Sequence, residues 1–181
     1  FWAVGAYNRL VRLRNAITNA FGQIDVQIKR RHDLVPNLVE VARQYLAHEA
    51  QTLEAVIAAR QQASQAERTA AANPLSAAAL GALSGAEQAL GGALGRLLAV
   101  AEAYPDLKAD QTLRELSEEL ASTENRIGFA RQAYNDQVLE FNDAAAQFPT
   151  LVIARLFGFV PQAMLESTRN DAEREPVRVQ F

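Results

Sequence analysis

The feature that most constrains the fold is an apolar repeat in the second half of the chain. Between residues 113 and 141, apolar or small side chains recur every three or four positions, which places them on one face of a helix. The repeat predicts one long helix that ends near Gln147, where Phe148-Pro149 stops it, and Asp110 is the expected N-cap. Its members are Leu113, Leu116, Leu120, Thr123, Ile127, Ala130, Tyr134, Val138 and Phe141.

A similar repeat near the N-terminus predicts a first helix over residues 7–31. Asp33 is then a plausible N-cap, and Pro36 suits the first turn of a following helix, where its missing N–H costs little. The sequence therefore predicts that the first helix ends near His32 and that a second begins there. The first repeat consists of Leu10, Leu13, Ile17, Phe21, Ile24 and Ile28, and the second of Leu34, Leu38, Val41, Tyr45, His48, Thr52, Ala55 and Ala59.

Residues 69–86 carry no charge and are rich in Ala, Ser and Gly around Asn73-Pro74, so we expect a helix–helix connection with a mobile portion. A third helix should follow and stop at Pro105, where Asp106 begins a tight turn. Its apolar positions are Ala86, Leu90, Leu94, Leu97, Ala101 and Tyr104.

Four helices joined by short turns predict an all-α fold, an up-and-down antiparallel four-helix bundle over residues 7–147. Composition agrees, because 35 of the 181 residues are alanine and only 15 are glycine or proline (9 and 6). After the bundle, residues 148–181 comprise an apolar segment followed by a flexible tail. We expect the apolar segment to cap the core or to lie near a membrane. The tail ends in an alternating pattern from Pro176 to Phe181, for which we expect disorder, a loose dock on the bundle or addition to a partner's sheet edge.

The first six residues are wholly apolar and include Trp2, a residue type enriched where membrane helices meet the headgroups. We interpret residues 1–6 as the stub of an N-terminal transmembrane helix. Residues 1–43 hold seven Lys and Arg against three acids, a local charge of +4 that leaves −7 for the remainder. By the positive-inside rule, this flank favours a cytoplasmic bundle.

Several classes of chemistry find no support in the sequence. The chain has no cysteine, and neither His32 nor His48 has the glutamate three residues earlier that a di-iron bundle uses. No serine stands in a nucleophile elbow and no glycine-rich phosphate loop is present. The net charge of −3 argues against nucleic-acid binding. We therefore expect no catalytic residues, no metal and no cofactor.

Two groups of residues are candidates for contact with a partner or with lipid. The first is a basic cluster that consists of Lys29, Arg30 and Arg31. Two interpretations are open: the cluster complements the dipole of the predicted helix end, or it binds an anionic partner or lipid headgroup. The apolar run 148–160, with Phe157 and Phe159, caps the open end of the core or lies in the membrane interface.

A polar row on the 111–147 helix has spacings of seven, four and seven residues. Its members are Glu124, Arg131, Asn135 and Asn142. Polar groups beside a helical seam often fix the register of packing, and we expect that structural role here.

Several motifs together resemble the LemA family, over residues 7–160 and in the same order. They are Tyr7-Asn8, residues 24–27, residues 29–40 (KRRHDLVPNLVE), residues 102–108 (EAYPDLK), residues 124–127, residues 130–135 (ARQAYN) and Phe148-Pro149. The resemblance implies a bacterial protein with one N-terminal transmembrane helix followed by a helical bundle, and it supplies no catalytic residues. The family's repeated positions correspond here to turns and seams and are expected to determine the fold: Asp33, Pro36, Tyr104, Pro105, Asp106, Glu124, Arg131 and Asn135.

The expected function is that of a non-enzymatic adaptor or scaffold at the bacterial inner membrane, anchored by a single span and binding a protein partner or its own copies. The alternative is a lipid- or envelope-sensing module that contacts anionic membrane through the basic N-terminal region and residues 148–160.

Overall fold

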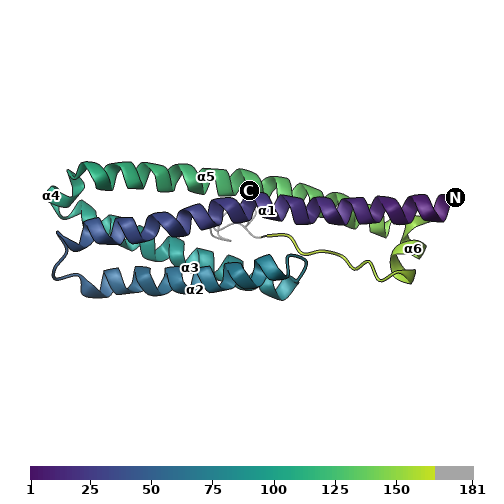
Figure 1. Ribbon diagram of the computed structural model, residues 1–181, viewed down its shortest axis with the longest axis horizontal. Helices are drawn as coiled ribbons and strands as arrows, with labels where there is room; N and C mark the ends of the chain where they lie inside the picture. The colour runs from purple at the N-terminus through teal and green to yellow at the C-terminus, as the bar shows by residue number, and fades with distance from the viewer. Residues whose placement is uncertain (166–181) are drawn as a thin grey trace, which may run out of the picture.

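The protein is an elongated all-helical molecule, seen here in a computed structural model that describes residues 1–165 (Figure 1). Its described residues form six helices: α1 (Trp2–Arg43), α2 (Ala50–Ala72), α3 (Ala77–Glu102), α4 (Pro105–Lys108), α5 (Gln111–Ala146) and α6 (Thr150–Leu156). The predicted all-α class is confirmed. The predicted arrangement, one four-helix bundle over residues 7–147, is not confirmed.

The long helices differ in length, and this difference sets the architecture. Helices α1 and α5, of 42 and 36 residues, lie side by side along the whole molecule. Helices α2 and α3 have 23 and 26 residues and form a hairpin that flanks only the half of the pair near α4 (Figure 1). In the other half, α6 and the extended chain after it cover the α1–α5 pair. We refer to residues 157–165 as the strap.

The prediction that the first helix ends near His32 is wrong. Helix α1 continues to Arg43 with Pro36 inside it and Asp33 exposed at an interior position, where it caps nothing. Proline removes the N–H that would bond the carbonyl four residues earlier, here that of His32. Arg60 of α2 replaces the missing donor, because its Nε donates to the His32 carbonyl oxygen at 2.8 Å. The break falls after Arg43 instead, so the predicted second repeat spans two helices and its member His48 is exposed in the turn.

The expected long connection over residues 69–86 is also wrong, because α2 extends to Ala72 and α3 starts at Ala77. Only residues 73–76 lie between the two helices. The Ser76 side chain caps α3 by accepting a hydrogen bond from the Ala79 N–H at 3.2 Å.

The predicted helix over residues 111–147 is confirmed as α5, and none of the nine members of its apolar repeat is exposed. Asp110 caps it by accepting a hydrogen bond from the Leu113 N–H at 3.1 Å. The same carboxylate accepts a hydrogen bond from Tyr45 Oη at 2.8 Å, which ties the α1–α2 turn to the start of α5. Both bonds favour the charged form of Asp110 and lower its pKa.

The core forms two clusters that follow this division. One lies among α1, α2, α3 and α5 and includes Val35, Leu38 and Leu97. The other lies mainly between α1 and α5, where Ile17, Phe21 and Phe141 are buried, and is closed by residues of α6 and the strap. The apolar face of α1 therefore has different partners in its two halves.

We expect Leu38→Ala to lower the free energy of unfolding by about 2–5 kcal/mol, because Leu38 is fully buried and truncation leaves a cavity. Urea unfolding measures this loss. The matched control is Val26→Ala on the same helix, where the side chain is 60% exposed and a change within about 0.5 kcal/mol is expected. Similar losses in the two variants would contradict the assignment of the buried face.

Candidate functional site

A buried polar layer joins α1, α2 and α3 near the middle of α1. His32 Nε2 lies 2.5 Å from Glu87 Oε1, and Arg31 Nη1 donates to Glu87 Oε2 at 3.2 Å. On the other side of the ring, Ser64 Oγ lies 3.3 Å from His32 Nδ1. With the bond from Arg60 to the His32 carbonyl, these contacts connect three helices. Arg31, His32 and Glu87 are buried, and their desolvation is offset only while they are paired.

A carboxylate pair extends the layer along α1. Lys29 Nζ lies 3.0 Å from Asp25 Oδ2 and 3.7 Å from Glu67 Oε1. One oxygen of each carboxylate, Asp25 Oδ1 and Glu67 Oε1, is buried without a hydrogen-bond partner. Burial, then the neighbouring Asp25, raises the pKa of Glu67 to about 7, and the same ion pairs raise the pKa of Lys29. Across residues 1–165, no three His, Asp or Glu side chains are grouped to hold a metal ion.

A groove runs between α3 and α5, because α3 packs mainly on α2 and α5 mainly on α1. Its central cavity has a volume of about 400 Å³, with apolar walls formed by Leu94 and Leu98 of α3 and Leu120 of α5. Further hollows continue it in both directions, one toward Leu113 and Arg114 and one toward Arg131 and Leu165. The groove therefore follows α5 from its first turns to the end of the strap.

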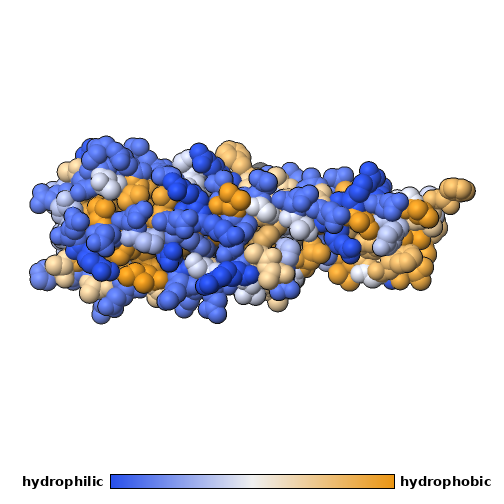
Figure 2. All heavy atoms as spheres, in the orientation of Figure 1, coloured by the Kyte–Doolittle hydropathy of each residue, from blue (hydrophilic) through white to orange (hydrophobic). Residues whose placement is uncertain are grey.

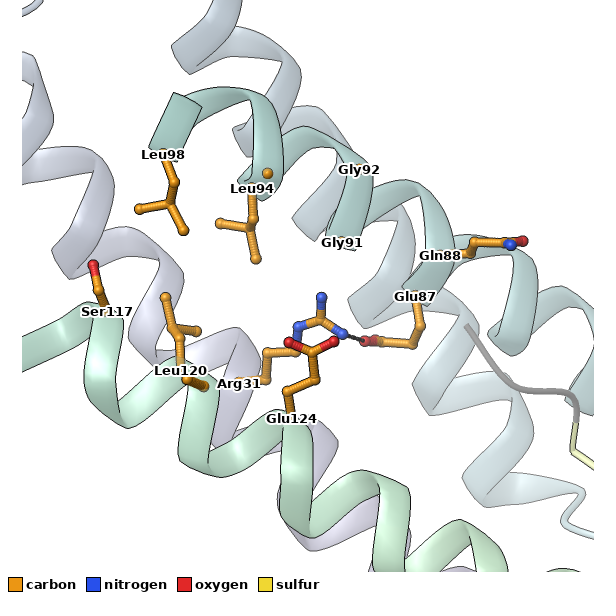
Figure 3. Close-up of a pocket in the computed structure, with 12 residues that line it drawn as sticks. Arg31, Glu87, Gln88, Gly91, Gly92, Leu94, Leu98, Ser117, Leu120 and Glu124 are labelled. Atoms are coloured by element: carbon orange, nitrogen blue, oxygen red, sulfur yellow. Dashed lines mark hydrogen bonds and ion pairs between the residues drawn. The ribbon is translucent and has the colours of Figure 1, made fainter. Parts of the chain in front are cut away.

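Arg31 lies in this groove, where its guanidinium pairs with the Glu87 carboxylate and the Glu124 side chain lines the same cavity (Figure 3). Arg31 approaches the α3 wall closely at Gly91, where an added Cβ would lie 3.1 Å from Arg31 Nη2. Arg31 is buried whereas Glu124 is exposed at the rim.

An exposed apolar end lies where α1 begins and α6 packs against it (Figure 2). Phe159 is buried there against Phe141 and Tyr7, and Arg14 lies 4.9 Å from its ring centroid. Phe157 contacts Tyr7 but remains 58% exposed. We define the apolar end by its exposed side chains, which are Phe1, Trp2, Val4, Tyr7, Phe148, Val152, Leu156, Phe157 and Val160.

The predicted basic cluster does not lie at a helix end, because α1 continues beyond it. Its three members are in ion pairs within the chain: Lys29 with Asp25, Arg30 with Glu119 and Arg31 with Glu87. Helix-end electrostatics is therefore the wrong explanation of the cluster. That these residues contact a partner or lipid stays a prediction.

The other predicted positions are distributed along the molecule. Tyr104 precedes α4 and donates from its hydroxyl to Glu49 Oε1 at 3.2 Å, while Pro105 opens α4 and Asp106 is exposed in its first turn. In the polar row of α5, Asn135 and Asn142 bind the strap, Arg131 lines the groove beside Leu165, and Glu124 lines it beside Arg31.

Residues 20–181 match the sequence model of the LemA family. The chain belongs to the LemA family. It is 27% identical over 171 residues to the magnetosome protein MamQ of Magnetospirillum gryphiswaldense, a match that covers 84% of this chain and 62% of MamQ. Magnetosome proteins MamQ 1 and MamQ 2 of Paramagnetospirillum magneticum are each 36% identical over 78 residues, which is 43% of this chain and 29% of theirs.

The longest of the LemA-like motifs, residues 29–40, contains both Pro36 and the two α1 members of the buried layer, Arg31 and His32. Their partners Arg60, Ser64 and Glu87 were not among the predicted site residues, and neither was Glu67, the partner of Lys29. A signal for two of them was present, since Glu67 and Glu87 occupy helical positions three or four residues from buried Ala63, Ala70, Leu83 and Leu90.

We expect the stability of the protein to decrease as the pH rises through about 7, because Glu67 binds a proton more tightly in the folded state than in the unfolded state. The contribution of Glu67 protonation to the free energy of unfolding is complete below about pH 4.5 and is lost as the pH rises through about 7. Glu67→Gln removes this titration, so the variant should gain stability relative to wild type between pH 5 and pH 8, by at most about 3 kcal/mol.

Urea unfolding at pH 5, 6, 7 and 8 measures the difference. The control is Glu54→Gln, an exposed glutamate on the same helix, whose stability should follow that of wild type throughout. A constant difference between Glu67→Gln and wild type across this range would contradict the assignment.

Proposed function

We propose that this LemA-family protein is a non-enzymatic, membrane-associated scaffold that contacts a bilayer through its apolar end and presents its long helical body to other proteins. The observation that carries the proposal is the concentration of exposed aromatic and aliphatic side chains at one end of an elongated molecule. Large exposed apolar patches mark protein or membrane contact sites.

The composition of the apolar end favours a bilayer interface as its partner. It combines exposed Trp2, Phe148 and Phe157 with aliphatic side chains of α6. Aromatic side chains favour the headgroup region, and a helix with one apolar face lies in the interface plane. The segment has two faces, since Ile153 and Ala154 of α6 are buried in the core while Val152 and Leu156 face outward.

The charges near the apolar end are mainly basic, with Arg9 and Arg14 on α1 and Arg155 on α6 against Asp143 on α5. Binding should depend mainly on apolar contact, with a smaller salt-dependent contribution from these arginines. This favours the scaffold over the alternative of a sensor of anionic lipid that acts through the basic N-terminal region, since Lys29, Arg30 and Arg31 are occupied in internal ion pairs.

The proposal includes attachment by a single N-terminal span to the bacterial inner membrane, with the helical body on the cytoplasmic side. The resemblance of the motifs to the LemA pattern and the excess of basic residues in residues 1–43 support it. None of the helices described in residues 1–165 is long and apolar enough to cross a bilayer. The chain spans 62% of the length of MamQ from Magnetospirillum gryphiswaldense.

We expect the double variant Leu156→Ser with Phe157→Ser to bind lipid vesicles about tenfold more weakly than wild type, or weaker still, with an unchanged melting temperature. Both side chains are exposed, so the substitution removes apolar contact with lipid and leaves the core intact. Vesicle flotation at low and high salt measures the binding, with vesicles of neutral lipid and of neutral lipid mixed with anionic lipid.

Phe129→Ser is the matched control, because this α5 side chain is 79% exposed and is not part of the apolar end. It should bind vesicles like wild type. Phe159→Ala should lower the melting temperature, because this side chain is part of the core. Equal binding by the double variant and wild type would contradict the proposal, and binding only to anionic vesicles at low salt would favour the lipid sensor.

A further inference from the structure

The strap is bound to α5 through its backbone. The Asn142 side chain donates to the Gln162 carbonyl at 3.0 Å and accepts from the Gln162 N–H at 2.8 Å. The Asn135 side chain makes the same pair of bonds with Leu165, both at 2.9 Å. Each amide thus satisfies both polar groups of one strap residue, a contact that any side chain at that position permits.

The spacing of these two contacts defines a register. Asn135 and Asn142 are seven residues apart on a helix, a rise of about 10.5 Å. Gln162 and Leu165 are three residues apart in extended chain, a length of about 10 Å. The strap therefore runs antiparallel to α5, with three of its residues for every two helical turns.

The described chain stops where the groove begins. Leu165 is buried and lines the hollow that also contains Arg131 and Glu87, and the groove continues from there toward Leu113. From Asn135 to Leu113, α5 rises about 33 Å. The 16 residues after Leu165 (166–181) span up to about 53 Å when extended, so their length is sufficient to follow the groove.

The charges in this sequence match those of the groove when the register is continued. Arg131 precedes Asn135 by four residues on the helix. By the ratio above, a strap residue about two positions after Leu165 would lie opposite it, next to Glu166. Glu124 precedes Asn135 by eleven residues, so about position 170 would lie opposite it, next to Arg169.

The match is weaker at the far end of the groove. Arg114 is 21 residues from Asn135, which corresponds to about position 174, where the sequence has Arg174 flanked by Glu173 and Glu175. Two charged side chains that line the groove, Arg131 and Glu124, thus have a residue of opposite sign within one position of the expected register.

We propose that the groove between α3 and α5 is a docking site for the chain's own residues 166–175, which continue the strap along α5 and cover the Arg31–Glu87 ion pair. A protein partner with the same pattern of backbone and charge would compete with this segment for the groove. The proposal goes beyond membrane attachment, and its test contains no lipid.

The absence of native cysteine allows a direct test with engineered pairs in the full chain. Ala121 lines the groove 14 residues from Asn135, which corresponds to positions 171–172. The pair Ala121→Cys and Ala172→Cys should form an intramolecular disulfide under mild oxidation at least about fivefold faster than the matched pair Ser122→Cys and Ala172→Cys. Ser122 is the neighbouring exposed residue and does not line the groove. Equal rates for the two pairs, or disulfides formed only between two molecules, would overturn the proposal.

A charge exchange in the same cysteine pair tests the register. Arg131→Glu should slow disulfide formation several-fold by placing two acids together, and the added substitution Glu166→Arg should restore the rate. The melting temperature of each variant distinguishes lost docking from lost folding, since Arg131 is only partly buried. A double variant that reacts no faster than Arg131→Glu alone, with its melting temperature unchanged, would overturn the assigned register.

Discussion

The hydrogen bond from Arg60 to the carbonyl of His32 is the interaction on which the arrangement of the helices depends. Proline in a helix interior leaves the carbonyl four residues earlier without its N–H and pushes against it. In this protein a cationic side chain from α2 supplies the missing donor at 2.8 Å. As a result, α1 stays continuous through Pro36, and α2 is fixed against it at that level.

The neighbouring contacts form a polar layer at the level of His32, and this layer favours one position of the α2–α3 hairpin along α1. The side chain of His32 lies between Ser64 of α2 and Glu87 of α3, and Glu87 also accepts from Arg31. Shifting the hairpin along α1 would break these pairs while their groups stay buried, which is costly in a low-dielectric interior. The layer therefore determines where α2 and α3 sit along α1, and the rest of the chain adapts to that position.

Two surfaces follow from the placement of this short hairpin. Beyond the hairpin, the α1–α5 pair would expose its apolar face, and α6 with the strap covers it. Beside the hairpin, α3 stays apart from α5, because it packs mainly on α2, and the groove remains between them. The apolar end and the groove are thus at different places along α5, so the membrane contact and the docked segment that we propose would not compete for one surface.

The sequence predicted the parts of the structure that depend on local pattern. The repeat from Leu113 to Phe141 and the cap at Asp110 were correct, because both depend on residues a few positions apart. The predicted break near His32 was wrong because the donor that compensates for Pro36, Arg60, is 24 positions further along the chain than the proline. The start of α3 was missed because an uncharged Ala, Ser and Gly sequence around Asn73-Pro74 is typical of a connection, whereas here it forms two helix ends with a short turn.

The candidate site was predictable only in fragments. Asn135, Asn142, Arg131 and Glu124 were identified as one polar row, but the pattern does not show that two of them bind the backbone of a segment 20–30 residues away. Phe157 and Phe159 were grouped as equivalent, and the structure separates them into an exposed and a buried side chain.

The measurement that tests the central claim most directly is a double-mutant cycle between Pro36→Ala and Arg60→Met, followed by urea unfolding. With Pro36 present, Arg60→Met should lower the free energy of unfolding by about 1.5–3 kcal/mol, because the His32 carbonyl loses its charged donor. In the Pro36→Ala background, the backbone N–H of the new alanine can donate to that carbonyl, so the same substitution should cost at least about 1 kcal/mol less. Equal losses in the two backgrounds would show that Arg60 does not compensate for the proline, and would contradict this account of how α1 continues through it.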